Sequence, residues 1–220
     1  MIVVATNNGI NFLPNLLSDL EKLNIKEEIS IIDTQSSDSE FIDYLENLKY
    51  FNKFKLKINV YQTPYKGFDT GAYIYAIQNL KSDRFIFLQD SIRIKNMGFF
   101  NLIDEKLKTS NIVTILTFEG GWWDNQIQKD FSLKHFGTTI FETGIFGPMF
   151  AITYIDSQKI EKNLLVYPEN KEQQKAMERC WDIIFKKTNL IVDNLEGNHN
   201  DLKINNDDYQ YFTKIKPYRI

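Results

Sequence analysis

Short apolar runs alternate with helical patterns along the first 95 residues. Residues 2–5 are a continuous apolar run with β-branched residues, which is typical of a strand buried on both faces, and the isoleucines of residues 29–32 predict a second buried strand. Residues 12–23 carry leucines at helical spacing, and a second amphipathic stretch begins near residue 41. Residues 55–61 alternate between apolar and polar positions. The pattern predicts strand, helix, strand, helix, strand.

The segment 67–91 extends this alternation and carries candidate chemistry. An acidic, glycine-flanked loop, Gly67-Phe68-Asp69-Thr70-Gly71-Ala72, enters a helical stretch that reaches residue 80. An apolar strand follows over residues 85–88 and ends in Gln89-Asp90-Ser91. Alternation of this kind predicts an α/β fold with a mostly parallel central sheet flanked by helices, Rossmann-like in layout. Ligands of such sheets bind beyond the carboxyl ends of the strands. The alternative is that Asp90 belongs to an ordinary polar turn.

The second half has a less regular pattern. Residues 111–118 and 145–152 are strand-like, and residues 119–135 indicate a long loop with some helix. Asn170 is placed to cap a helix over residues 171–187, and the chain from residue 194 onward has the composition of a loop-like tail. No internal repeat or linker divides the sequence, so we expect a single domain over residues 1–220.

Composition narrows the classes of partner. The net charge is −3 without a long basic run, which disfavours nucleic acid because phosphate backbones require clustered Lys and Arg. The single cysteine, Cys180, excludes an intrachain disulfide and a cysteine-based zinc site, and it fits a reducing compartment. The apolar start is too short for a signal peptide or a transmembrane segment. We expect a cytoplasmic location, with attachment to a membrane-bound assembly left open.

Several familiar nucleotide and hydrolase motifs are absent from the sequence. The sequence contains no Gly-x-Gly-x-x-Gly turn after the first strand, no Walker loop and no Gly-x-Ser-x-Gly elbow. What remains is a set of acidic and amide residues after the predicted strands. These are Thr6-Asn7-Asn8, Asp33-Thr34-Gln35-Ser36-Ser37-Asp38, Lys66-Gly67-Phe68-Asp69-Thr70-Gly71-Ala72 and Gln89-Asp90-Ser91.

In the order and spacing of these motifs the chain resembles GT-A fold glycosyltransferases of the family 2-like group and is similar to rhamnan-synthesis-type members. The resemblance covers residues 1–95 well and is thinner to residue 187. It implies a nucleotide-binding half over 1–95 and an acceptor-side half over 96–220. It also implies a nucleotide-diphosphate sugar donor and a saccharide or glycan acceptor, and it leaves open a location peripheral to a membrane-bound glycan assembly system. The donor-site residues it implies are Thr6, Asn8, Asp33, Gly67, Asp69 and Asp90.

The resemblance further implies Mn²⁺ or Mg²⁺ held by an Asp-x-Asp motif. Hard cations of this kind bind several oxygen ligands. In this chain Asp90 stands between Gln89 and Ser91, so one acidic position of the motif is lost. We expect Asp90 to be the principal metal ligand, with His199 reaching back from near the C-terminus. The alternatives are an exposed loop histidine and a site without metal.

Three carboxylates are candidates for the catalytic base. Glu172 precedes Arg179 at the spacing of a Glu-Asp…Arg motif, with Gln in place of the Asp, and Glu178 is the alternate. Asp124 is the third, beside Trp122 and Trp123 in a glycine-bearing loop whose aromatic faces suit an acceptor sugar. The alternatives are solvated helix charges for the glutamates and core packing for the tryptophans.

We therefore expect a glycosyltransferase. Arg93 and Lys95, just after Asp90, are candidates to neutralise phosphate charge, although solvent exposure is the simpler expectation. Two alternatives remain open. One is a nucleotidyltransferase, disfavoured because the turn after the first strand lacks Arg and Lys, and the other is a non-catalytic carbohydrate- or nucleotide-binding module on a decayed GT-A scaffold.

Overall fold

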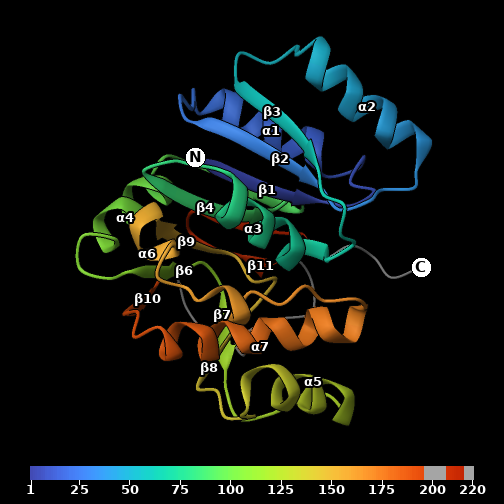
Figure 1. Cartoon of the computed structure of the whole chain (residues 1–220). Helices are drawn as coiled ribbons and strands as arrows, with labels where there is room; N and C mark the ends of the chain where they lie inside the picture. The colour runs from blue at the N-terminus through green and yellow to red at the C-terminus, as the bar shows by residue number, and fades with distance from the viewer. Residues whose placement is uncertain (196–206, 216–220) are drawn as a thin grey trace.

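A mostly parallel sheet forms the centre of the molecule (Figure 1). The computed structural model describes residues 1–195 and 207–215. Within them the sheet has seven strands in the order β10-β6-β9-β4-β1-β2-β3, and β9 alone runs antiparallel to its neighbours. The strands are β1 (Ile2–Thr6), β2 (Glu28–Asp33), β3 (Lys57–Gln62), β4 (Arg84–Gln89), β6 (Ile112–Thr114), β9 (Phe150–Thr153) and β10 (Val192–Asn194). The predicted α/β class and parallel sheet are confirmed.

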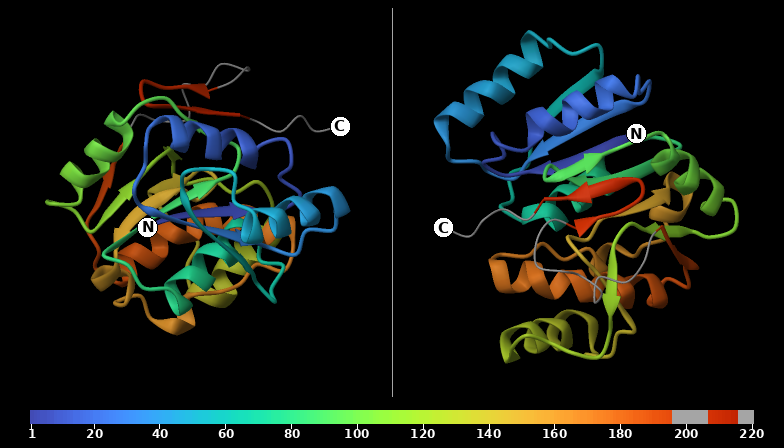
Figure 2. Two further views of the ribbon diagram at one scale, coloured as in Figure 1. Left: turned by 90° about the horizontal axis from the view of Figure 1, so that it is seen from above. Right: turned by 180° about the vertical axis from the view of Figure 1, so that it is seen from behind.

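Helices cover both faces of the sheet (Figures 1 and 2). One face is covered by α1 (Leu13–Lys22), α2 (Ser39–Tyr50) and α4 (Gly98–Lys106). The other face is covered by α3 (Phe68–Asn79) and α7 (Lys171–Lys187), and α5 (Gln126–Phe136) packs on the outer side of α7. The short helices α6 (Tyr154–Ser157) and η1 (Lys162–Leu164) lie between β9 and α7 in the chain. The predicted cap of α7 is confirmed, since the Asn170 side chain accepts hydrogen bonds from the Glu172 and Gln173 amides.

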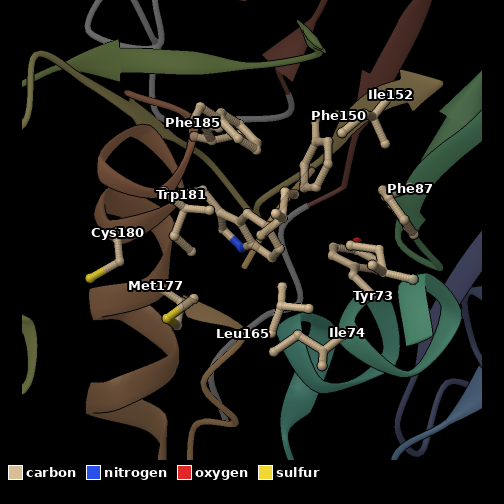
Figure 3. Close-up of a cluster of buried hydrophobic side chains, with 14 of the residues drawn as sticks. Tyr73, Ile74, Phe87, Phe150, Ile152, Leu165, Met177, Cys180, Trp181 and Phe185 are labelled. Carbon is tan, nitrogen blue, oxygen red and sulfur yellow. The ribbon is translucent and has the colours of Figure 1, made fainter. Parts of the chain in front are cut away.

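Aromatic side chains fill the space between α7, α3 and the sheet (Figure 3). The Phe150 ring lies 4.9 Å from both the Phe87 and the Trp181 rings, and the Tyr73 ring lies 4.8 Å from Phe87. All four side chains are fully buried. Rings at these centroid separations interact favourably beyond their area burial. The cluster therefore fixes α7 and α3, which carry three of the candidate carboxylates, against the sheet.

Two strand predictions in the second half are wrong in detail. The run 111–118 is divided into β6 and β7 (Thr117–Glu119), and the run 145–152 into β8 (Thr143–Ile145) and β9. Gly147 separates the second pair with a φ of +57°, a conformation that ends a strand and that glycine adopts without strain. The strands β7 and β8 pair antiparallel as a separate ribbon. The helix that was expected within the long loop over 119–135 is α5, which is capped by the Asn125 side chain.

The predicted loop-like tail is also wrong in part. Strands β11 (Asp207–Asp208) and β12 (Phe212–Lys214) form an antiparallel sheet with β5 (Ile92–Ile94). Figure 2 shows this small sheet on the rear side of the molecule. Among the described residues, no helix combines the length and the apolar character that crossing a membrane requires.

Candidate functional site

Four charged side chains from four elements meet beyond the carboxyl ends of β1 and β4. They are Asp69, Asp90, Glu178 and Lys214, and we call them the strand-end cluster. Their charges act on one another: Lys214 interacts with all three carboxylates, and Asp69 interacts with Asp90 and Glu178. The sequence predicted the three carboxylates as site residues, but not that they form one cluster.

Asp90 directly follows β4 and is held by the end of β1. The Thr6 hydroxyl donates to Asp90 Oδ2 at 2.6 Å, and the Asp90 amide donates to the Ala5 carbonyl at 3.2 Å. A Cβ at Gly9 would lie 2.1 Å from Asp90 Oδ2, so a side chain at this position would displace the carboxylate. Burial, reinforced by the charge of Asp69, raises the pKa of Asp90 to about 7.

Asp69 lies in the first turn of α3, where the helix dipole favours a negative charge. Its Oδ2 accepts a hydrogen bond of 2.5 Å from the Gln89 side-chain amide. Burial raises the pKa of Asp69, while the Gln89 hydrogen bond and the charges of Lys171 and Lys214 oppose that rise. Gln89, the last residue of β4, thus connects Asp69 of α3 to the strand that precedes Asp90.

Gly67 immediately precedes α3. A Cβ there would lie 2.5 Å from the Gly71 Cα, so the turn has no room for a side chain. This contact explains the need for glycine at that position. The role of Gly67 in approaching a nucleotide stays a prediction.

Glu178 projects into the cluster from the middle of α7. Its carboxylate accepts a hydrogen bond from the Gly147 amide, and burial raises its pKa to about 7. The charges of Arg179 and Lys171 lower that pKa, and the charge of Asp69 raises it. A carboxylate with a pKa near neutrality is suited to accept a proton at physiological pH.

Lys214 is the member of the cluster that the sequence did not indicate. Its side chain is 3% exposed, and its ammonium group donates to the Ser91 hydroxyl. Burial lowers the pKa of Lys214 to about 8, against the charges of Asp69, Asp90 and Glu178, which raise it. No motif marks this residue, because only the pairing of β12 with β5 brings it beside Ser91.

Asn8 and Asp33 extend the site along the ends of β1 and β2. The Asn8 side chain accepts hydrogen bonds of 2.9 Å from the Ser37 and Asp38 amides, so it ties the two strand ends together. Asp33 is 2% exposed and accepts from the Ser36 amide and hydroxyl. Burial raises the pKa of Asp33. Both residues lie on the predicted edge, and their roles in nucleotide binding stay predictions.

Glu172 lies in a hydrogen-bonded network between α5 and α7. Its Oε2 accepts from Asn125 at 2.5 Å and from the buried Gln128 amide at 2.9 Å, and its Oε1 pairs with Lys175. These contacts lower the pKa of Glu172 to about 2. Such a carboxylate accepts protons poorly near neutral pH, so the contacts favour a structural role over that of the predicted base.

Asp124 belongs to the same region as Glu172. Its Oδ1 pairs with the buried Arg179 guanidinium at 2.9 Å, and that guanidinium lies 4.5 Å from the Trp122 ring centre. Trp122 is 48% exposed, whereas Trp123 packs against Phe141. The first tryptophan therefore offers an aromatic face to solvent, and the second is held by core contacts.

The remaining predicted residues lie outside the cluster or outside the described chain. Arg93 forms a two-fold ion pair with Asp19 of α1 at 2.5 and 2.7 Å, so its charge is used within the fold. Lys95 donates to the Tyr209 carbonyl. His199 lies outside the described residues.

A divalent cation does not fit the described residues of the cluster. No group of three or more His, Cys, Asp or Glu within residues 1–195 and 207–215 could hold a metal ion. The carboxylates of Asp69 and Asp90 accept hydrogen bonds from neutral side chains, and the buried Lys214 ammonium lies beside them. A metal ion at Asp90 would face this like charge. The pairing of Asp90 with His199 on Mn²⁺ or Mg²⁺ stays a prediction.

Comparison with solved structures identifies the architecture. No protein-family description and no curated protein matches the chain. S. aureus TarS residues 1–349 in complex with UDP superimposes with a TM-score of 0.54 at 17% identity, covering 88% of this chain and 56% of that one. S. aureus TarS gives 0.53 at 16% identity, covering 96% and 35%. GalNAc-T7 with UDP, GalNAc and Mn²⁺ gives 0.53 at 15% identity, covering 82% and 40%.

These neighbours are GT-A glycosyltransferases, and the similarity shows that this chain has the GT-A fold. The predicted fold is thereby confirmed. The chain spans between about a third and just over half of the length of these neighbours. At identities of 15–17%, the likeness fixes the architecture and leaves substrates and activity to be argued from the site.

Proposed function

We propose that this protein is a glycosyltransferase that moves a sugar from a nucleotide-diphosphate donor to a saccharide or glycan acceptor. The observation that carries the proposal is the strand-end cluster, which joins Asp69, Asp90 and Glu178 at the carboxyl ends of β1 and β4. Ligands of open α/β sheets bind at such strand ends. The presence of UDP in the TarS and GalNAc-T7 structures supports a uridine nucleotide as the first donor to test.

The donor would lie along the ends of β2, β1 and β4. In this proposal Asp33 accepts hydrogen bonds from the nucleoside, and Asn8 and Thr6 shape the turn that faces it. Gly67 lets the α3 loop approach the nucleotide without a side chain in between. Asp69 and Asp90 then lie on the diphosphate side of the site.

Glu178 is the catalytic base that we propose, for a transfer that inverts the anomeric centre. The acceptor hydroxyl oxygen forms a bond to the anomeric carbon, and the bond from that carbon to the donor phosphate oxygen breaks. The hydroxyl proton passes to the Glu178 carboxylate, and the nucleoside diphosphate leaves with the bonding electron pair. The pKa of about 7 suits Glu178 to this transfer better than Glu172, whose pKa is about 2.

The acceptor side of the site is proposed to include Trp122. Its 48% exposed indole lies against the Arg179 guanidinium, which follows Glu178 directly in α7. Flat aromatic faces of this kind pack well on the apolar face of a sugar ring. Asp124, paired with Arg179, helps to position this surface.

Calorimetric titration with a panel of nucleotide sugars, with and without Mn²⁺, tests the proposal. One donor should bind, and a transfer or donor-hydrolysis assay with that donor should show turnover that Glu178→Gln removes. Glu46→Gln, at an exposed position of α2, is the matched control and should behave as the unmodified protein. Failure of every nucleotide sugar to bind would refute the proposal. Binding without turnover, unchanged in Asp90→Ala, would favour the non-catalytic module.

A further inference from the structure

Lys214 is the buried cation of the strand-end cluster. A buried ammonium is costly unless charged or polar groups compensate it. Here the Ser91 hydroxyl accepts a hydrogen bond from the Lys214 ammonium, and the charges of the three carboxylates of the cluster favour its protonated form. The fold therefore places the Lys214 ammonium on the diphosphate side of the proposed donor site.

The backbone determines where this charge lies. Lys214 pairs with Ile92 in the β12–β5 ladder, and the Ile215 amide donates to the Ser91 carbonyl at 3.0 Å. An Asp-x-Asp motif that includes Asp90 would need a second carboxylate at position 88 or 92, where this chain has Leu88 and Ile92. Ser91 directly follows Asp90, and its hydroxyl accepts a hydrogen bond from the Lys214 ammonium.

The other nearby cations are engaged elsewhere or lie at the surface. Arg93 pairs with Asp19, and Arg179 pairs with Asp124. Lys171 is exposed, with its ammonium 5.7 Å from the Phe68 ring centre. A diphosphate would bring further negative charge to an edge that already holds three carboxylates. Among these cations, the Lys214 side chain combines burial with a place beside Asp90.

We propose that the Lys214 ammonium supplies, within the donor site, the positive charge that a divalent cation supplies beside an Asp-x-Asp motif. Donor binding would then proceed without added metal. This inference rests on the proposed function, because it requires a diphosphate at the strand ends. In this inference Lys214 takes the role that the resemblance assigned to Mn²⁺ or Mg²⁺.

Binding of nucleotides without their sugar tests the inference apart from activity. UDP, dTDP, GDP and CDP, each with its monophosphate, are titrated calorimetrically into the whole protein in EDTA and in Mn²⁺. One diphosphate should bind in EDTA, and Mn²⁺ should change its affinity by less than about threefold. Lys214→Met should weaken that diphosphate by roughly 10–100-fold, the cost of one charged hydrogen bond, and leave the monophosphate much less affected.

Three further variants separate a charge effect from a folding effect. Lys214→Arg should retain most of the diphosphate affinity, because it retains the charge. Ser91→Ala removes the hydroxyl that holds the ammonium and should give an intermediate loss, which keeps the test decisive if Lys214→Met does not fold. Lys187→Met, at an exposed position in the last turn of α7, should bind like the unmodified protein.

The outcomes distinguish this inference from the proposed function. Diphosphate binding that requires Mn²⁺ would overturn the inference and leave the glycosyltransferase proposal standing. Unchanged affinity in folded Lys214→Met would overturn it as well, and so would unchanged affinity in Ser91→Ala if Lys214→Met does not fold. Absence of binding by every nucleotide and nucleotide sugar in both conditions would refute the proposed function and this inference together.

Discussion

Replacing Asp90 by asparagine should stabilise the ligand-free protein, and the gain should be larger at alkaline pH. The carboxylate is held close to Thr6 and Gly9 and is repelled by Asp69. Asparagine has nearly the same shape and keeps an oxygen that accepts the Thr6 hydrogen bond. The substitution therefore removes a charge from the strand-end cluster with little change in packing.

The magnitude follows from the pKa of Asp90. Folding raises it from 3.8 to about 7, which at 1.36 kcal/mol per unit corresponds to about 4 kcal/mol. Since the folded-state pKa lies above the unfolded value, stability is lost as pH rises between these two values. At about pH 5 the ionisation penalty is about 2 kcal/mol, and at about pH 8.5 it reaches about 4 kcal/mol. The gain from Asp90→Asn should thus be larger at the higher pH by about 2 kcal/mol.

Urea unfolding in EDTA at both pH values, followed by circular dichroism, measures this difference. Asp43→Asn, at an exposed position of α2, is the control and should change the free energy of unfolding little at either pH. A gain from Asp90→Asn that is equal at the two pH values, or a loss at both, would refute the electrostatic reasoning.

Glu178→Gln should lower kcat by roughly 100–10,000-fold at unchanged fold, whereas Glu172→Gln should keep most of the activity; the reverse order would contradict the assignment of the base. The kcat/KM of the unmodified protein should fall as pH drops below about 7, where Glu178 takes up a proton, and a flat profile would oppose this role. Gly9→Ala should weaken donor binding, measured by calorimetry, because its Cβ would lie 2.1 Å from Asp90 Oδ2; unchanged affinity would show that the carboxylate can move aside. Trp181→Ala should reduce the free energy of unfolding by about 3–5 kcal/mol in urea titration, and a loss below about 1 kcal/mol would contradict the packing described.

The structure of the first 95 residues was predictable because their elements are long and strongly patterned. Continuous apolar runs such as residues 2–5 can be satisfied only in a buried strand, and polar residues at the ends of parallel strands must meet at one edge. The second half lacks this signal. Its described strands are two to four residues long, and Gly147 ends one strand inside a run that looks uniformly apolar in the sequence.

The sequence indicated Asp69, Asp90 and Glu178 as site residues, but it did not indicate that they form one cluster with Lys214. Asp90 follows β4, so sequence placed it at the edge directly. Glu172 was proposed from its spacing to Arg179, but Asn125 and Gln128, about 45 residues away in the chain, turn it into a structural carboxylate. Lys214 carries no local signal, since its position depends on a strand pairing across 123 residues.

The strand that carries Lys214, β12, follows every strand of the central sheet in the chain and joins the molecule by pairing with β5. All seven strands of the central sheet lie before Leu195, whereas the buried ammonium arrives with residue 214. Contacts so distant in the chain form late in folding, because their loop-closure entropy must be overcome first. The charge beside Asp90 is thus set by one position on a peripheral strand. A change there could alter which anion the site accepts and leave the α/β scaffold untouched.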